Sequence, residues 1–495
     1  MALLPYLLFR QKHLQDGTSL RSPKFEYSDA QLLIDRTAWN AERQSYVQSH
    51  QIFEAILKEV EAADAYLILD FFLWNPWTGD VDTSGGLRLL STELADALLR
   101  KRIQNPDMPI LVITDPINRI YGNQAPAFYD RFAEAKIPVV YTDLSKLPDS
   151  NKVYAPQAWF WSKFLPAGDA ENDTRPIPNS LDGKSDKLTL AQFGRLLYFK
   201  ANHRKVLIAG YKQTAPRLIT GSLNPADGSA NHSNLAVSVD GVVAIYATHS
   251  ELHVAEWSSE NPAQIHLGRS FEAANAIAKI RRILPAVSTL PLARVGAPSV
   301  AWRSEGAIHD ELILQIDRAG QGDRIDAAIF YFSDRKVVES IKGAVTRCAR
   351  VRILMDANHD AFGREKIGIP NRTVASEFME LAATGEVEVR WGATHGEQYH
   401  AKVLRIYGET QDLLFLGSAN WTRRNLSDLN LEANLLFERS GVIGQNFDAY
   451  FNTIWTNEEG LVESLPYGDW AEEGWSLKWK RWVYRFQEWS GASTF

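Results

Sequence analysis

The chain has 495 residues, of which 45% are apolar and 23% charged, a balance typical of a globular protein with a sizeable core. Its net charge of −7 argues against general binding to nucleic acid, which depends on Lys and Arg, but is compatible with a local basic pocket. Cys348 is the only cysteine, which excludes an intrachain disulfide and a metal site built from cysteines.

Helical and strand-like patterns alternate along both halves of the chain. The helical patterns cover residues 51–65, 87–102, 308–320 and 335–348, and apolar strands follow them at 66–74, 108–115, 325–332 and 349–357. Such alternation is typical of layered α/β folds. We therefore expect an α/β fold in which each half forms one α/β/α unit around a mixed sheet.

Apolar stretches in this sequence are short. A membrane-spanning helix needs ~20 apolar residues, whereas the run AYLILDFFLW at 65–74 is interrupted by Asp70 and is typical of a buried strand. The start of the chain, MALLPYLLFRQKH, has no basic segment before its apolar residues, so we interpret it as mature sequence.

A short motif occurs twice. His203-x-Lys205 in NHRKVLI and His400-x-Lys402 in QYHAKVL both lead into an apolar strand. Because strand side chains alternate between two faces, the His and Lys of each copy point to the same face. An imidazole and an ammonium placed side by side suggest a shared anionic ligand.

The sequence downstream of each motif also repeats. GSLN at 221–224 corresponds to GSAN at 417–420, and the asparagines that end them lie 21 and 20 residues after their histidines. Asn234 and Asn430 follow 31 and 30 residues after the same histidines. Since three landmarks keep their spacing to within one residue, the sequence predicts an internal duplication.

The duplication sets the expected domain organisation. The first unit covers residues 1–290 and contains a polar insertion near 145–190, whose length is typical of a lid or binding loop. The second unit covers residues 291–495 and ends in an aromatic and basic tail near 475–489. We expect the two units to pack around a pseudo-twofold axis, so that a monomer forms a pseudo-dimer within one chain.

This set of residues suits phosphoryl transfer without a metal or a cofactor. One neutral imidazole can attack phosphorus, and a second can give a proton to the leaving alkoxide and take one from the incoming water or alcohol. Ammonium and amide groups can hold the charged phosphate oxygens. The expected phosphate ligands beside the lysines are Ser222, Asn224, Ser418 and Asn420, with Asn234 and Asn430 in supporting positions.

The pattern resembles the phospholipase D superfamily, whose signature is His-x-Lys with a downstream Gly-Ser-x-Asn, twice per active site. The resemblance covers roughly residues 50–440, and FKANHRKVLI, NPADGSANHSN, GIPNR and HGEQYHAKVL are similar to bacterial phospholipase D and cardiolipin-synthase-like proteins. It implies that a phosphatidyl group is transferred to water or an alcohol through a phosphohistidine. The implied substrate is a phospholipid at a membrane surface, and the implied location is soluble or peripheral at a bacterial membrane, cytoplasmic or periplasmic.

The sequence departs from the family pattern in informative places. The motif Asp is replaced by Gly210 in the first copy and Tyr407 in the second. The family's later acidic residue is present as Glu432, and counting from Asn234 places Ala236 at the corresponding position of the first copy. The resemblance then implies that Glu432 orients His203 as the nucleophile and that His400 is the general acid and base. His232 shows no partner pattern.

Two alternatives remain. The first is a metal-independent nuclease of the same superfamily, against which the net charge of −7 counts. The second is a catalytically idle lipid-binding or scaffold protein, which the missing motif Asp allows and the two complete His-x-Lys pairs disfavour. If the protein acts on lipid or only binds it, the tail at 475–489 is the candidate for membrane contact, because Trp is interleaved with Lys and Arg there.

Overall fold

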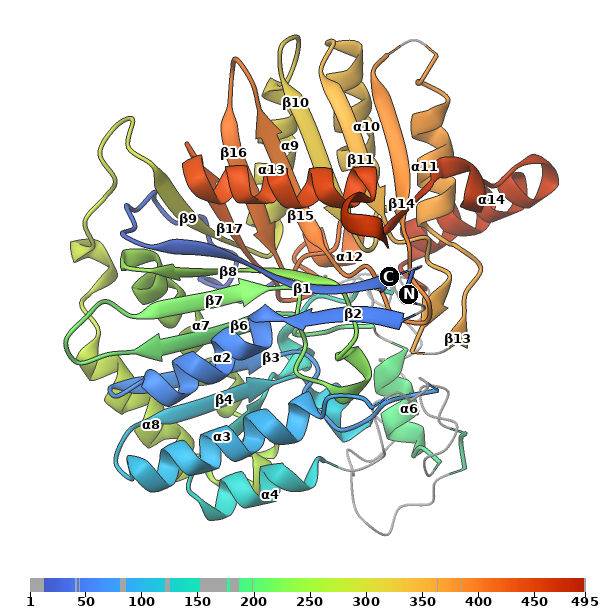
Figure 1. Cartoon of the computed structure of the whole chain (residues 1–495). Coiled ribbons are helices and arrows are strands. Elements are labelled where there is room, and N and C mark those ends of the chain that lie inside the picture. Colours follow the sequence, from blue (N-terminus) through green and yellow to red (C-terminus); the bar gives the residue numbers. More distant parts are fainter. Residues whose placement is uncertain are drawn as a thin grey trace, which may run out of the picture.

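The computed structural model describes residues 13–493 except 41, 44, 81–85, 121–124, 152–175, 179–186, 198, 363 and 384. These residues form two α/β units, each built on a mixed sheet (Figure 1). In Figure 1 the strands of the first sheet run across the view in blue and green, and those of the second run up it in yellow to red. The predicted fold class is confirmed.

The first sheet is assembled from the first half of the chain and one late strand. Its strands are β1 (Ala30–Asn40), β2 (Ser45–His50), β3 (Tyr66–Phe71), β4 (Ile110–Thr114), β5 (Val139–Tyr141), β6 (Lys205–Gly210), β7 (Arg217–Gly221), β8 (Asn234–Asp240) and β18 (Leu461–Val462). Their order is β18-β1-β8-β7-β6-β3-β4-β5, with β2 also paired to β1. Only the β3–β4 and β4–β5 pairs among these are parallel.

The second sheet repeats this topology. Its strands are β9 (Ser299–Ser304), β10 (Arg324–Ile329), β11 (Arg350–Met355), β14 (Val387–Gly392), β15 (Lys402–Tyr407), β16 (Asp412–Gly417), β17 (Ala433–Glu438) and β19 (Ser464–Pro466), and a separate hairpin joins β12 (Asp360–Ala361) to β13 (Arg364–Glu365). The order β9-β17-β16-β15-β10-β11-β14 matches β1-β8-β7-β6-β3-β4-β5 strand for strand. The duplication seen in the sequence is therefore a duplication of fold.

Helices cover both faces of each sheet. The α-helices are α2 (Gln51–Ala62), α3 (Leu90–Gln104), α4 (Ala127–Glu134), α6 (Leu190–Leu196), α7 (Val242–Ser259), α8 (Ser270–Ile283), α9 (Gly306–Arg318), α10 (Arg335–Thr346), α11 (Asn371–Met379), α12 (Arg423–Leu426), α13 (Gly441–Thr456) and α14 (Gly474–Ser490). Short 3₁₀ turns lie at Pro116–Arg119, Leu144–Lys146, Asp227–Ser229, Pro262–Gln264, His266–Gly268, Val287–Thr289, Glu458–Gly460 and Tyr467–Trp470. None of the helices in this described part of the chain has the length and apolarity to cross a bilayer.

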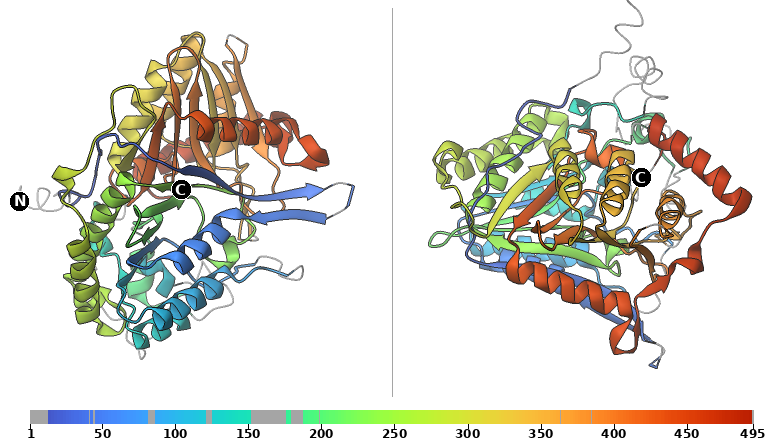
Figure 2. Two further views of the ribbon diagram at one scale, coloured as in Figure 1. Left: turned by 60° about the vertical axis from the view of Figure 1, so that its left-hand side comes forward. Right: turned by 90° about the horizontal axis from the view of Figure 1, so that it is seen from above.

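Side chains alternate between the two faces of a strand, so one strand contributes to the hydrophobic core on each side of its sheet. Along β3, Leu67 and Leu69 pack with α2 and α3, whereas Tyr66 and Ile68 pack with α7 on the opposite face. The same division occurs in the second sheet, where α9 and α10 cover one face and α13 the other (Figure 2). Because both faces are covered, the central strands read as continuous apolar runs.

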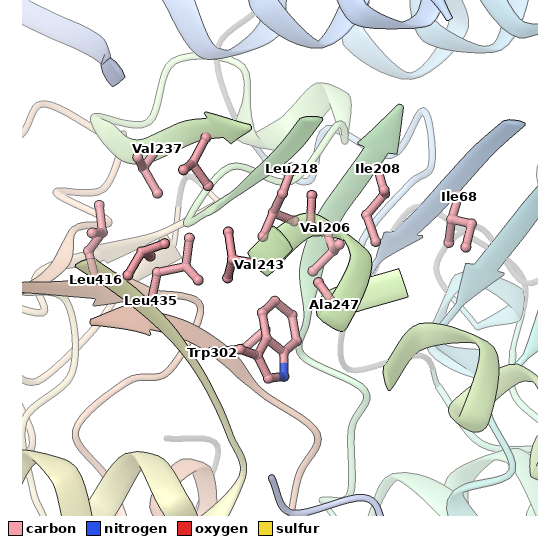
Figure 3. Packing of buried hydrophobic residues seen from close by; sticks show 14 of the residues in the cluster. Ile68, Val206, Ile208, Leu218, Val237, Val243, Ala247, Trp302, Leu416 and Leu435 are labelled. Carbon is pink, nitrogen blue, oxygen red and sulfur yellow. The ribbon is translucent and has the colours of Figure 1, made fainter. Parts of the chain in front are cut away.

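One apolar core joins the two units. Val243 and Ala247 of α7 lie beside Trp302 of β9, and the same cluster continues to Leu416 and Leu435 of the second sheet (Figure 3). Burial of this surface holds the two sheets in a fixed relation. The two His-x-Lys motifs depend on that relation, since one lies in each unit.

The expected boundary between the units and the expected insertion can each be compared with the structure. The boundary at 290–291 falls between α8 and β9, but Leu461–Val462 crosses back to pair with β1 of the first sheet. The limits therefore stay a prediction. Most of the expected insertion at 145–190 lies outside the described residues.

Candidate active site

The two His-x-Lys motifs stand at the entrance of equivalent central strands. Lys205 is the first residue of β6 and Lys402 the first of β15. Each histidine is held by the other half of the chain, because the N–H of His203 donates to the carbonyl of Leu431 (2.9 Å) and that of His400 to the carbonyl of Ser233 (2.8 Å). These reciprocal bonds bring the two motifs together around a pseudo-twofold axis.

Equivalent side chains surround each motif. The Nζ atoms of Lys205 and Lys402 donate to the carbonyls of His203 and His400, each at 2.7 Å. Phe72 lies 4.9 Å from the imidazole of His203, ring centre to ring centre. Its counterpart Phe330 lies 4.7 Å from the imidazole of His400. An apolar ring thus packs against each imidazole and limits its contact with water.

The two imidazoles differ in what they bind at Nδ1. His203 Nδ1 lies 2.9 Å from Oε1 and 3.1 Å from Oε2 of Glu432, which is fully buried. His400 Nδ1 lies 3.0 Å from Oδ1 of Asn234. In both cases Nδ1–H donates, so Nε2 carries the lone pair. Only His203 has a carboxylate behind it.

Asn234, and not Ala236, is the structural equivalent of Glu432. Ser222 Oγ donates to Asn234 Oδ1 at 2.9 Å, and Ser418 Oγ donates to Oε2 of Glu432 in the same way. The first copy spans 12 residues between these partners and the second 14, so counting from the later asparagines misaligns them. Ala236 lies within β8, opposite Gly221.

The serines and asparagines of the Gly-Ser-x-Asn segments have separate roles. The hydroxyls of Ser222 and Ser418 donate to Asn234 and Glu432, and their expected contact with phosphate stays a prediction. Asn224 Oδ1 accepts from the N–H of Leu73 at 3.3 Å. Asn420 Oδ1 is buried with no hydrogen-bond partner among the described residues.

Asn430 holds the backbone next to the first motif. Its Oδ1 accepts from the N–H of Ala201 at 3.0 Å, two residues before His203. Asn234 Nδ2 donates to the carbonyl of His232 at 3.0 Å, within its own segment. Both residues therefore support the site, and Asn234 in addition contacts an imidazole directly.

Burial and mutual repulsion lower the basicity of the site. Burial, followed by Lys205 and Lys402 against the opposing charge of Glu432, lowers the pKa of His203 to about 4. The pKa of His400 is well below its usual value, through burial and the positive charges of Lys402 and Lys205. Burial lowers the pKa of Lys205 to about 7 and that of Lys402 well below the ordinary range. Both imidazoles are therefore neutral at pH 7 without a ligand, and an anion would draw protons into the site.

Two buried aspartates position the motifs and were missed from the sequence. Asp115 Oδ2 accepts from the N–H of Asn202 at 2.7 Å, and Asp356 Oδ2 accepts from the N–H of Tyr399 at 2.8 Å. Burial raises their pKa to about 7 and about 6. The signal was present, because each aspartate directly follows an equivalent strand in ITD and LMD.

A buried ion cluster crosses between the units behind His203. Arg204 has no exposed surface and lies 2.7 Å from Oε1 of Glu305 and 3.0 Å from Oε1 of Glu251. Glu305 Oε1 also accepts from the N–H of Glu432 at 3.0 Å. The cluster therefore links the strand of the nucleophile candidate to the segment that carries its carboxylate.

No group of three or more His, Cys, Asp or Glu side chains suited to a metal ion occurs among the residues described for this chain. The site as built consists of imidazoles, ammonium groups, amides and one carboxylate. That donor set is suited to hold an anion between two basic halves.

Comparisons with known proteins concern the family of one segment and the overall fold. Residues 312–455 match the family described as cardiolipin synthase, PLD-like domain. Phosphatidylserine synthase of Haemophilus influenzae Rd KW20 is 11% identical, with 99% of this chain and 98% of that chain covered at a TM-score of 0.55. No curated protein sequence matched.

Two further solved structures match with lower TM-scores and over smaller shares of this chain. Nuc from Salmonella typhimurium, a phospholipase D family member, is 18% identical over 34% of this chain and 98% of that chain, with a TM-score of 0.27. Polyphosphate kinase from Porphyromonas gingivalis is 10% identical over 86% of this chain and 50% of that chain, with a TM-score of 0.41. Residues 312–455 are thus similar to the PLD-like domain of the cardiolipin synthase family, and the chain shares its overall fold with the Haemophilus synthase.

Proposed function

We propose that this protein is a phosphodiesterase or phosphatidyltransferase that acts on phospholipids through a phosphohistidine, with His203 as the nucleophile. The observation that carries the proposal is the contact between His203 and Glu432, which has no counterpart at His400. A carboxylate at Nδ1 fixes the tautomer and stabilises the positive charge that develops on an attacking imidazole. The amide oxygen of Asn234 carries no full charge, so it stabilises a positive imidazole less than a carboxylate does.

The first step forms a bond from His203 Nε2 to phosphorus and breaks the bond from phosphorus to the leaving alcohol. His203 is suited to attack because its pKa of about 4 leaves Nε2 unprotonated at pH 7. His400 gives the proton that the leaving oxygen needs. The negative phosphodiester raises the pKa of His400, because the positive charges that lower it are then neutralised.

The second step reverses these roles. Water or an alcohol attacks phosphorus, His400 takes its proton, and the bond from phosphorus to His203 breaks. Lys205 and Lys402 hold the non-bridging oxygens throughout, since each Nζ uses one donor on a backbone carbonyl and keeps two more. The chemistry uses side chains of this chain alone, with no metal and no cofactor.

A phospholipid is the proposed substrate class. The family matched by residues 312–455 is described as cardiolipin synthase, PLD-like domain, and one solved structure with the same overall fold is a phosphatidylserine synthase. The net charge of −7 disfavours the nuclease alternative. Water and alcohols compete for the same phosphohistidine, so hydrolysis and transfer are two outcomes of one intermediate.

One assay separates the candidate functions. The protein is incubated in EDTA with radiolabelled phosphatidylglycerol, with phosphatidylcholine and with single-stranded DNA. We expect phosphatidate or cardiolipin to form from the lipids and the DNA to stay intact. Cleaved DNA would favour the nuclease, no reaction with any substrate would favour a scaffold, and activity lost in EDTA would contradict the metal-free mechanism.

A further inference from the structure

One face of α14 carries a row of exposed aromatic side chains. Its members are Trp475, Trp479, Trp482, Phe486 and Trp489, which are 86%, 54%, 67%, 44% and 62% exposed. At 100° per residue their spacing places all five within an arc of about 80°. A helix on the surface of a globular protein normally turns its apolar stripe inward. In α14 the orientation is reversed.

The opposite face of α14 fixes the helix to the second unit. Tyr484 is fully buried, and its hydroxyl donates to the carbonyl of Ser333 at 2.7 Å. Glu488 accepts from Ser333 Oγ at 2.7 Å and from the N–H of Arg423 at 3.1 Å. Arg481 pairs with Glu380. The aromatic row is therefore held outward by specific polar contacts on the inner face.

The loops that anchor α14 also carry residues of the candidate active site. Ser333 lies three residues after Phe330, whose ring packs on His400, and Arg423 lies three residues after Asn420. Figures 1 and 2 show α14 at the outer edge of the second unit, beside α11. The helix that carries the row is thus fixed to two loops that also carry residues of the site.

The charge beside the row is positive. Lys478 Nζ lies 5.3 Å from the ring centre of Trp475, and Arg485, which is 60% exposed on the same side of the helix, lies 3.5 Å from Oε1 of the buried Glu377. Within α14 four residues are basic and Glu488 alone is acidic, although the chain carries −7 overall. Indole rings bordered by Lys and Arg suit the headgroup region of a bilayer that contains anionic lipids.

We propose that the outer face of α14 docks the protein on an anionic phospholipid bilayer. This deepens the proposed function, because the bilayer is then both the docking partner and the source of the substrate. The row is about 21 Å long from Trp475 to Trp489, so the helix would lie flat along such a surface.

Vesicle binding tests the proposal without any turnover. We expect the protein to co-sediment with vesicles of phosphatidylcholine and phosphatidylglycerol, and the triple variant Trp479→Ala, Trp482→Ala, Trp489→Ala to bind at least about ten-fold less. Lys478→Glu with Arg485→Glu should lower binding about five-fold per charge, only when phosphatidylglycerol is present. Phe271→Ala, which removes a ring 79% exposed on α8, is the matched control and should bind like the unaltered protein.

Three outcomes would overturn this docking surface. One is unchanged vesicle binding by the triple variant. Another is a dimer of the unaltered protein that the triple variant dissociates, with no vesicle binding by either, which would make the partner a second copy. A third is equal loss of turnover on vesicles and on a soluble phosphodiester, which would make α14 structural. Vesicle binding without turnover of any lipid would instead reject the proposed function and leave the docking surface standing.

An independent observation concerns His232, which is 3% exposed and lies 5.8 Å from His400, ring centre to ring centre. Its Nδ1 accepts from the N–H of Gln398 at 3.2 Å, so a neutral ring carries its proton on Nε2. That Nε2–H has no hydrogen-bond partner among the described residues. A buried donor left unpaired costs about 1–3 kcal/mol, and a ligand oxygen would remove that cost.

Pseudosymmetry shows that the backbone contact does not need a histidine. Asn430 holds the N–H of Ala201 in the first motif as His232 holds that of Gln398 in the second. What His232 adds is a second ring nitrogen, on a ring whose centre lies 5.8 Å from that of His400. Resting on the proposed function, we infer that His232 Nε2–H binds the oxygen of the acceptor or leaving alcohol beside His400.

His232→Asn is the matched test, because asparagine already makes the equivalent backbone contact at position 430. We expect it to raise the KM for an acceptor alcohol and to lower the ratio of transfer to hydrolysis by about five- to ten-fold. An unchanged ratio, or a fall in thermal stability with equal loss of both reactions, would overturn the inference. Absence of any lipid turnover by the unaltered protein would reject the proposed function itself.

Discussion

His203 Nδ1 and Glu432 Oε1 lie 2.9 Å apart although 229 positions separate the two residues in the chain. The contact crosses from the first unit to the second, and Glu432 is fully buried where it occurs. Neither half of the duplicated chain therefore holds a complete site. The asymmetry between Glu432 and Asn234 distinguishes two imidazoles that have equivalent lysines and phenylalanines beside them.

Replacing the carboxylate tests the assignment of the nucleophile. Glu432→Gln keeps the size of the side chain but removes the charge that stabilises an imidazolium at His203, so we expect kcat to fall about 10²–10⁴-fold. His203→Asn should abolish formation of the phosphohistidine, which mass spectrometry can locate in protein denatured in alkali, because its phosphorus–nitrogen bond survives alkali but not acid. A phosphoryl group found on His400 would reverse the assignment.

Asn234→Asp would give His400 the carboxylate that it lacks. A negative charge at Nδ1 favours the protonated imidazole and raises the pKa of His400, which is now held low by burial and the two lysines. We expect the alkaline limb of the pH profile of kcat/KM to move to higher pH. An unshifted alkaline limb would show that His400 is not the group that titrates there.

Anion binding should be accompanied by proton uptake at pH 8. Burial lowers the pKa of Lys205 to about 7, so this amine is mostly neutral at pH 8 in the empty site. A bound sulfate, which does not itself titrate there, returns the pKa toward the ordinary value and draws in about one proton. Isothermal titration in buffers of different ionisation enthalpy measures the uptake, and Lys205→Met should reduce it. Binding with no proton uptake would contradict the prediction.

The buried cluster around Arg204 should matter more for stability than for chemistry. Arg204→Met leaves Glu251 and Glu305 buried without their cation, and we expect the free energy of unfolding to fall by about 3–5 kcal/mol. The triple variant Arg204→Met, Glu251→Gln, Glu305→Gln removes the unpaired charges as well and should recover part of the loss. Urea denaturation compares them. A triple variant less stable than Arg204→Met would contradict this account.

The sequence by itself determined the fold class and the two motifs. Alternation of helical and strand patterns predicted the layered sheets, and the repeated spacing from His203 and His400 predicted the duplication, because both are local properties of the chain. The aspartates after ITD and LMD were accessible to the same reasoning. Periodicity likewise shows that the aromatic residues of 475–489 share one helix face.

Only the tertiary structure decided which residues complete each site. The loops that carry Asn234 and Glu432 differ by two residues in length, so spacing alone paired Glu432 with Ala236. The contact of His232 with Gln398 and the outward orientation of the α14 aromatics were likewise invisible in the sequence. These features depend on hydrogen bonds and packing between segments far apart in the chain, and a local pattern fixes which face a residue occupies but not what that face meets.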